Sequence, residues 1–122
     1  MSKKVSFEGI GEVAATFYAD GTVKTGQTVA CSGDSTVKLC AAGSRFCGVA
    51  VGNDRGGCVG VQTGGFAQVK CADSTVTVGY VTLTGDGSGG VKKVSTATGS
   101  TDKGQEYLVV ADDGAGIITI KL

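Results

Sequence analysis

The chain has 122 residues, with 11 basic and 11 acidic side chains and no histidine. Balanced charge argues against partners that bind through a strong electrostatic field, so we expect no direct contact with nucleic acid or membrane. Without histidine, the most frequent general base and metal ligand is missing. We therefore expect no catalytic residues, no metal and no cofactor.

The composition predicts an all-β protein. There are 17 Val and 14 Thr against 4 Leu and 4 Ile, together with 22 Gly and no Pro. β-Branched side chains pack well on pleated sheets, and glycine supplies tight turns. We expect a compact small β-barrel or β-sandwich of short strands with Gly-rich turns. Residues 1–122 form a single β domain in this prediction, with residues 1–11 as a mobile N-terminal arm.

Strand-like runs follow one another at short intervals along the chain. They cover residues 12–18, 27–31, 36–40, 45–51, 58–62, 66–71, 75–83, 91–94, 106–111 and 117–122. Clusters of Gly, Ser, Asp and Asn separate them, as is typical of a sandwich or barrel. The short Thr-Gly-Gly spacer at residues 63–65 predicts a hairpin between the strands on either side of it.

Alternation within three of the runs predicts which side chains are buried. In "IITIKL", Ile118, Ile120 and Leu122 share one face. In "FAQVKC" the shared face carries Ala67, Val69 and Cys71. The run "GVAVG" at residues 48–52 places only small residues opposite its valines, which predicts the close approach of another backbone or another subunit.

The Gly-rich stretch between Arg45 and Cys71 invites comparison with a phosphate loop. No glycine in the chain precedes a lysine and no helix is predicted after the stretch, so the phosphate-loop pattern is absent. The segment "GNDRGG" is better explained as a hairpin loop in which Asn53 and the glycines adopt positive φ. Asp86, Asp112 and Asp113 similarly fit turn formation better than a calcium loop.

Five cysteines raise the alternative of thiol chemistry. They occupy positions 31, 40, 47, 58 and 71, an odd number with no Cys-x-x-Cys pair. We expect reduced thiols that serve as small apolar fillers. A cysteine-dependent enzyme or redox protein is the alternative, and it would need an activating base that the sequence does not provide. We expect that the protein is not an enzyme.

The order of segments resembles small head-decoration (capsid-cement) proteins of tailed bacteriophages and prophages. The similarity lies in "VAATF", "VKTGQTV", "SGDSTV", "AAGSRFCGVA", "VGVQTGGFAQVKCAD", "VGYVTLTGDGSGGVKK" and "EYLVVADDGAGIITIKL", which together cover most of the chain. The resemblance implies a structural protein, often trimeric, that binds the outer surface of the mature head and stabilises it against internal DNA pressure. The major capsid protein would be its partner, and no catalytic residues are carried over.

Location and contact residues follow as expectations. The start of the chain lacks the apolar run of a secretory signal, so we expect synthesis in the host cytoplasm and a final place on the outer capsid surface of the virion. Terminal segments can add to a partner's sheet edge, which makes Lys3, Lys4, Val5 and Phe7 the predicted capsid contact. The alternative function is a tail or head-fibre recognition module that binds host-surface glycans.

Overall fold

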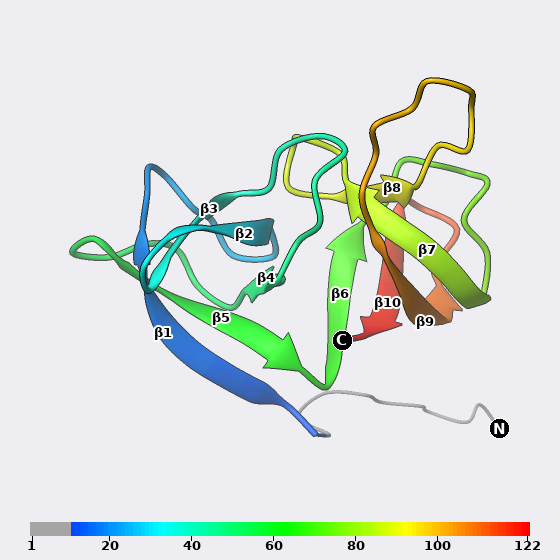
Figure 1. Cartoon of the computed structure of the whole chain (residues 1–122). Coiled ribbons are helices and arrows are strands. Elements are labelled where there is room, and N and C mark those ends of the chain that lie inside the picture. The colour runs from blue at the N-terminus through cyan, green and yellow to red at the C-terminus, as the bar shows by residue number, and fades with distance from the viewer. Residues whose placement is uncertain (1–10) are drawn as a thin grey trace, which may run out of the picture.

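The computed structural model describes residues 11–122, and this range contains strands and no helix (Figure 1). No helix that could span a membrane is therefore present in this range. The ten strands are β1 (Val13–Ala19), β2 (Thr28–Gly33), β3 (Thr36–Leu39), β4 (Gly48–Ala50), β5 (Cys58–Gly64), β6 (Phe66–Lys70), β7 (Gly79–Gly85), β8 (Val91–Lys93), β9 (Gln105–Asp112) and β10 (Ile117–Lys121). The predicted all-β class is confirmed.

The first five strands close into a small barrel in the order β1-β3-β2-β4-β5, with β5 returning to β1. All neighbours run antiparallel except β1 and β3, which pair in parallel through Tyr18 and Ala19. β-Branched residues fill the interior because their side chains stand compactly on a pleated surface. The buried members of this barrel core are Val23, Val29, Val37, Ala50, Val59 and Val61.

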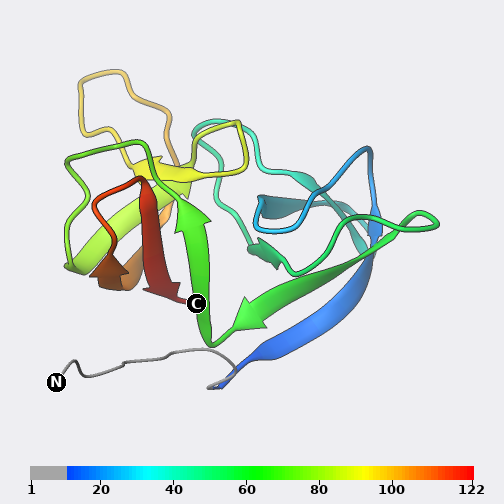
Figure 2. The ribbon, with the colours of Figure 1, turned by 180° about the vertical axis from the view of Figure 1, so that it is seen from behind.

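The last five strands form a second sheet in the order β6-β10-β9-β7-β8. Every neighbouring pair in it is antiparallel. Seen from behind, this sheet and the barrel lie side by side (Figure 2). A larger core belongs mainly to this half and includes Val69, Leu83, Tyr107, Val109 and Ile120, each at most 6% exposed.

The predicted alternation is confirmed in β6, and in β10 the predicted face is buried, although Thr119 on the opposite face is buried as well. Ala67, Val69 and Cys71 are buried while Gln68 and Lys70 are exposed. Ile118 and Ile120 are buried as well, with Leu122 packed against the same core. A period of two in the sequence thus identified the buried face of both strands.

The predicted hairpin at residues 63–65 is wrong, because β5 and β6 belong to different sheets. β5 is paired on both sides, with β1 and with β4, whereas β6 pairs with β10. The chain turns from barrel to sheet at Gly65, whose φ of 84° is in the left-handed region that suits glycine. A side chain there would also meet Glu12, whose backbone would lie 2.8 Å from the new Cβ.

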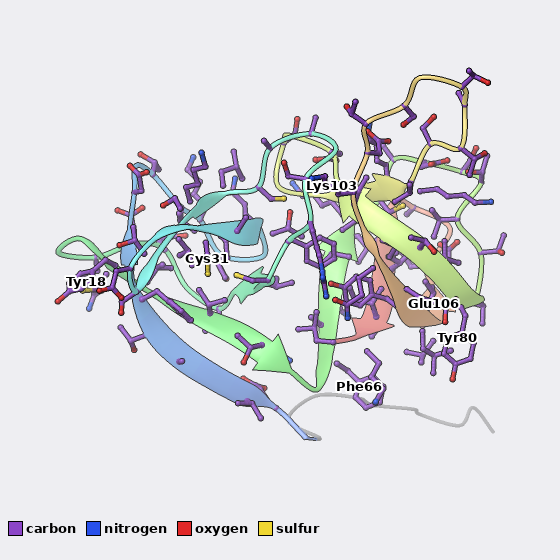
Figure 3. All side chains as sticks on the ribbon, viewed as in Figure 1. Tyr18, Cys31, Phe66, Tyr80, Lys103 and Glu106 are labelled. Atoms are coloured by element: carbon purple, nitrogen blue, oxygen red, sulfur yellow. The ribbon has the colours of Figure 1, made fainter. Side chains whose placement is uncertain are left out.

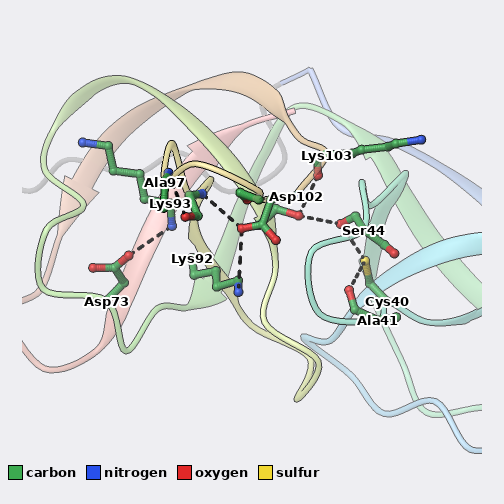
Figure 4. Close-up of polar contacts among 12 residues, drawn as sticks. Cys40, Ala41, Ser44, Asp73, Lys92, Lys93, Ala97, Asp102 and Lys103 are labelled. Atoms are coloured by element: carbon green, nitrogen blue, oxygen red, sulfur yellow. Dashed lines mark hydrogen bonds and ion pairs between the residues drawn. The ribbon is translucent and has the colours of Figure 1, made fainter.

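Hydrogen bonds between residues far apart in the chain join the two halves. The Thr28 backbone N–H donates to Gly89 O (2.9 Å), and its hydroxyl donates to Gly90 O (3.1 Å). The buried Thr84 hydroxyl lies 2.9 Å from Ser44 O and 2.6 Å from Lys103 O. Ser44 and Lys103 are both labelled in the close-up of Figure 4. Such long-range bonds hold the barrel and the second sheet in one arrangement.

Strand β4 lies between the two cores and serves both. Val49 packs in the larger core, whereas Ala50 packs in the barrel core. At Gly48 a Cβ would lie only 2.5 Å from Gln62 O, so the backbones of β4 and β5 approach closely. The close approach predicted from "GVAVG" is confirmed at Gly48, where the approaching backbone belongs to the same chain, but a Cβ at Gly52 would have nothing within 4 Å.

The hairpin loop predicted at "GNDRGG" is confirmed, because it joins the antiparallel strands β4 and β5, but the predicted positive φ is found at its last two glycines and is wrong for Gly52 and Asn53. Gly56 and Gly57 have φ of 58° and 79°, but Asn53 is not among the residues with positive φ. Its side chain oxygen instead accepts a hydrogen bond from the Thr25 N–H (2.9 Å). Asn53 therefore ties two loops together rather than forming the turn.

Candidate functional site

The predicted capsid contact at Lys3, Lys4, Val5 and Phe7 lies outside the described residues, as does most of the predicted arm. The described chain begins at Gly11. A Cβ added to Gly11 would lie 3.9 Å from the Cα of Gly65. The chain therefore enters the described fold beside the turn that joins the barrel to the second sheet.

Strand β1 presents an unpaired edge within the described part of the chain. Along its whole length it pairs with β5, but on its other side only Tyr18 and Ala19 have partners, in β3. The Tyr18 N–H points to this second side, where it donates to Ser35 O (2.8 Å). Because backbone groups alternate along a strand, those of Ala14 and Thr16 point to the same, unpaired side.

The side chains along this β1 edge (Val13–Phe17) carry no charge. Val13 is 58% exposed, Ala14, Ala15 and Thr16 are also exposed, and Phe17 packs against the barrel core. A bulge interrupts the pairing with β5 only between Val13 and Ala14. An exposed, uncharged strand edge is a template for pairing with another chain.

A second surface crosses the outer face of the second sheet. Tyr80 in β7 lies opposite Leu108 in β9, Leu108 lies opposite Lys121 in β10, and Lys121 lies opposite Phe66 in β6. Tyr80 is 72% exposed, and Val78 beside it is 61% exposed. Tyr80, Glu106 and Phe66 appear at this end of the molecule in Figure 3. This cross-strand row is an apolar stripe with one lysine in it.

A third feature is an open groove between the barrel and the second sheet, with a volume of about 510 Å³. On one wall the buried Phe46 ring stacks on Tyr107, with ring centroids 4.9 Å apart and planes 11° apart. The Arg45 guanidinium donates a hydrogen bond to the side chain oxygen of Gln105. Cys31 and Cys47 also line the groove, Cys31 from the position on β2 labelled in Figure 3.

The filler interpretation of the cysteines holds for two of the five. Cys40 and Cys71 are buried, and their thiols donate to backbone carbonyls, Cys40 to Ser44 O (3.2 Å) and Cys71 to Asp73 O (3.6 Å). Burial raises the pKa of both thiols. For Cys31 and Cys47 the interpretation is wrong, since both are exposed, and Cys58 is half-buried.

The turn-forming interpretation of the aspartates is confirmed. The Asp86 carboxylate accepts from the N–H groups of Ser88 (2.7 Å) and Gly90 (2.9 Å), and Asp113 accepts from Ala115 (2.7 Å) and Ile117 (3.1 Å). Within residues 11–122, no cluster of three or more Cys, Asp or Glu side chains is arranged to hold a metal ion. These carboxylates stabilise loops.

The β1 edge and the cross-strand row were not found from the sequence. "VAATF" contains no charge in five residues, which could have indicated an edge made for pairing. The row could not have been found, because it depends on the register of four strands that lie far apart in the chain.

Solved structures that match this chain include one that is similar over nearly the whole fold. The base of the bacteriophage phi29 head fibre, "head fiber gp8.5 N base", superposes with a TM-score of 0.59, covering 91% of this chain and 93% of that chain at 20% identity. At this identity the likeness establishes a shared fold. No protein-family model matches the chain. No curated protein matches it either.

Proposed function

We propose that this protein is a structural protein of a bacteriophage head that binds the outer surface of the mature shell and stabilises it. The single observation that carries the proposal is the fold, which is similar over 91% of this chain to a phage head-fibre base. The independent resemblance of the sequence to head-decoration proteins supports the same assignment. The major capsid protein is the proposed partner, and the protein acts without catalysis.

The β1 edge supplies the proposed contact with the shell. An extended segment of the capsid protein would pair with β1 as an additional strand. It would form hydrogen bonds with the free backbone N–H and C=O groups of Ala14 and Thr16. The other two outer strands, β6 and β8, are built differently. β8 has only three residues, two of them Lys92 and Lys93, and β6 ends in Lys70. Lysine and short length protect an edge against pairing, so β1 is the edge that this fold leaves open.

Stabilisation of the shell would follow from mass action. A protein that binds only the mature shell lowers the free energy of that state by its own binding free energy at every site. In a trimer, which is the proposed oligomer, three β1 edges would engage neighbouring shell subunits together. Linked contacts add avidity without a large individual interface. Lys3, Lys4, Val5 and Phe7 remain a predicted additional contact.

Binding to purified heads tests the proposal. The full chain is mixed with DNA-filled heads from which its own copies have been removed, and the heads are banded on a density gradient. Wild type is expected to band with the heads at a fixed ratio to the shell protein and to raise the temperature at which they release DNA. Absence of the wild-type protein from the banded heads would refute the proposed function.

A matched pair of variants tests the β1 edge separately. Ala14→Lys with Thr16→Lys places two charges on the open edge, and we expect at least about a tenfold loss of affinity, which corresponds to 1.4 kcal/mol. Gln68→Lys with Thr82→Lys adds the same charge at exposed positions of β6 and β7 and should bind as wild type. Sedimentation of the free protein shows whether either change alters the oligomer. Equal binding by the two variants would remove β1 from the interface but leave the proposed function standing.

A second candidate function is favoured by the nature of the structural match. Because that protein is the base of a head fibre, this chain is also a candidate base for a recognition fibre on the head. Binding to host-surface glycans on an array, with heads that lack the protein as the control, separates this function from shell stabilisation.

A further inference from the structure

We propose that Cys31 and Cys47 are a disulfide site, at which the two thiols join within one chain once the protein meets an oxidising environment. This inference goes beyond the proposed function. A virion component leaves the reducing cytoplasm in which it is made, and disulfides persist outside such compartments. The pairing itself rests on the positions of the two cysteines.

Strand pairing brings the two cysteines together although 15 residues lie between them in the chain. β2 runs antiparallel to β4, with Val29 opposite Gly48. The Cys47 N–H extends the pairing by donating to Val29 O (2.8 Å). With Val29 opposite Gly48, the register continues to Ala30 opposite Cys47, so Cys31 is the next residue along β2 and a diagonal neighbour of Cys47. The two strands that carry the cysteines lie about 4.7–4.9 Å apart.

The two side chains also meet. Both line the groove between the barrel and the second sheet. Burial raises the pKa of Cys47 to about 11, and the neighbouring Cys31 thiol adds to the rise. Arg45 and Tyr107 line the same groove. Cys47 is therefore a protonated, uncharged thiol at neutral pH.

Accessibility distinguishes this pair from the other cysteines. Cys31 and Cys47 are exposed, and the groove that they line opens to solvent, so a small disulfide can reach them. Cys40 and Cys71 are buried and hydrogen-bonded to carbonyl groups. Cys58 is half-buried in another depression, lined by Thr16, Phe17, Tyr18 and Ser35.

The oxidant in this proposal is a low-molecular-weight disulfide such as oxidised glutathione. One cysteine loses its proton, and its thiolate attacks the small disulfide to form a mixed disulfide and release one thiolate. The second cysteine then loses its proton and attacks the protein sulfur of that mixed disulfide. The intramolecular bond forms, a second small thiolate leaves, and the two released thiolates take up the two protons. Because thiolate is the nucleophile, the reaction accelerates as pH rises from 7 toward the pKa of Cys47.

The bond would lie within the barrel, beside its junction with the second sheet. It would tie β2 to the segment that leads into β4, immediately after Phe46, whose ring stacks on Tyr107 of the second sheet. Closing a loop of this length in the unfolded chain stabilises the native state in the chain-entropy account. We expect the midpoint of thermal unfolding to rise on the order of 10 °C.

The test uses the isolated full chain, so its outcome does not depend on binding to phage heads. Reduced protein is incubated with oxidised glutathione at pH 8, remaining thiols are alkylated, and the cysteines are located by peptide mass mapping. Cys31→Ser, Cys47→Ser and Cys58→Ser are treated in parallel, the last as the matched control. Thermal unfolding is recorded before and after oxidation.

We expect wild type and Cys58→Ser to lose two hydrogens, to yield a linked peptide joining Cys31 to Cys47, and to unfold at a higher temperature. Cys31→Ser and Cys47→Ser should carry glutathione on the remaining groove cysteine and show no such rise. Alkylation of both groove cysteines in oxidised wild type would overturn the proposal. A link between two chains in place of the internal one would overturn it as well.

Discussion

The stacked pair of Phe46 and Tyr107 gives the sharpest prediction for stability, because Phe46 belongs to the barrel half and Tyr107 to the second sheet. Phe46 is 2% exposed and its ring centroid lies 4.9 Å from that of Tyr107. Truncating a buried Phe to Ala costs about 3–5 kcal/mol, of which about 0.5–1.5 kcal/mol is the aromatic pairing. The Tyr107 hydroxyl donates to the backbone oxygen of residue 46 (3.5 Å), which the substitution leaves in place.

We therefore expect Phe46→Ala to lower the free energy of unfolding by about 3–5 kcal/mol, a large part of the about 5–15 kcal/mol of a typical domain. Urea unfolding followed by circular dichroism measures it, with the slope against urea checked for constancy. Tyr80→Ala is the control, because this ring is 72% exposed and its loss should change stability by no more than about 0.5 kcal/mol. A loss below about 1 kcal/mol for Phe46→Ala would refute the view that this ring joins the two halves.

Two further predictions concern backbone packing and pH. Gly48→Ala would place a Cβ 2.5 Å from Gln62 O and should lower the free energy of unfolding by about 1–3 kcal/mol. Gly52→Ala, whose Cβ would have nothing within 4 Å, should leave stability unchanged or raise it by up to about 1 kcal/mol. Equal melting temperatures for the two variants would contradict this prediction. The Thr75 hydroxyl and N–H hold the pKa of Asp73 below its ordinary value of 3.8. The ionised Asp73 carboxylate therefore stabilises the fold fully at pH values above 3.8, and this stabilisation is lost as the pH falls through the lowered pKa. The urea midpoints of wild type and Asp73→Asn should accordingly differ at pH 6 and converge at lower pH. A constant difference would contradict this assignment.

Local patterns predicted the strands because burial in a strand repeats every two residues. The alternation in "FAQVKC" and "IITIKL" identified the buried side chains of β6 and β10, since a half-buried strand needs only its own sequence to show its two faces. The same alternation placed Cys71 on the buried face. Cys40 was predicted to be buried only as one of five cysteines expected to serve as small apolar fillers. All of these inferences concern one strand at a time.

Pairing between strands could not be predicted in this way. Thr-Gly-Gly at residues 63–65 has the composition of a hairpin turn, yet β5 finds partners on both sides in the barrel, and β6 pairs with β10 some 50 residues later. A spacer of three residues limits how far apart two strand ends lie, but it does not decide which strand each will join. That choice is made by burial of the whole chain, which favours two small cores here.

Each candidate functional feature of the described fold depends on such pairing. The β1 edge is open because β3 meets only the last two residues of β1. The cross-strand row exists because the registers of three strand pairs align Tyr80 with Phe66 through β9 and β10. The two groove cysteines are neighbours because β2 lies beside β4. A shift of one residue in any of these registers would turn the side chains to the other face. The proposed contact surfaces therefore depend on register, which the sequence alone does not show. The predicted contact in the terminal segment lies outside the described residues and stays a prediction.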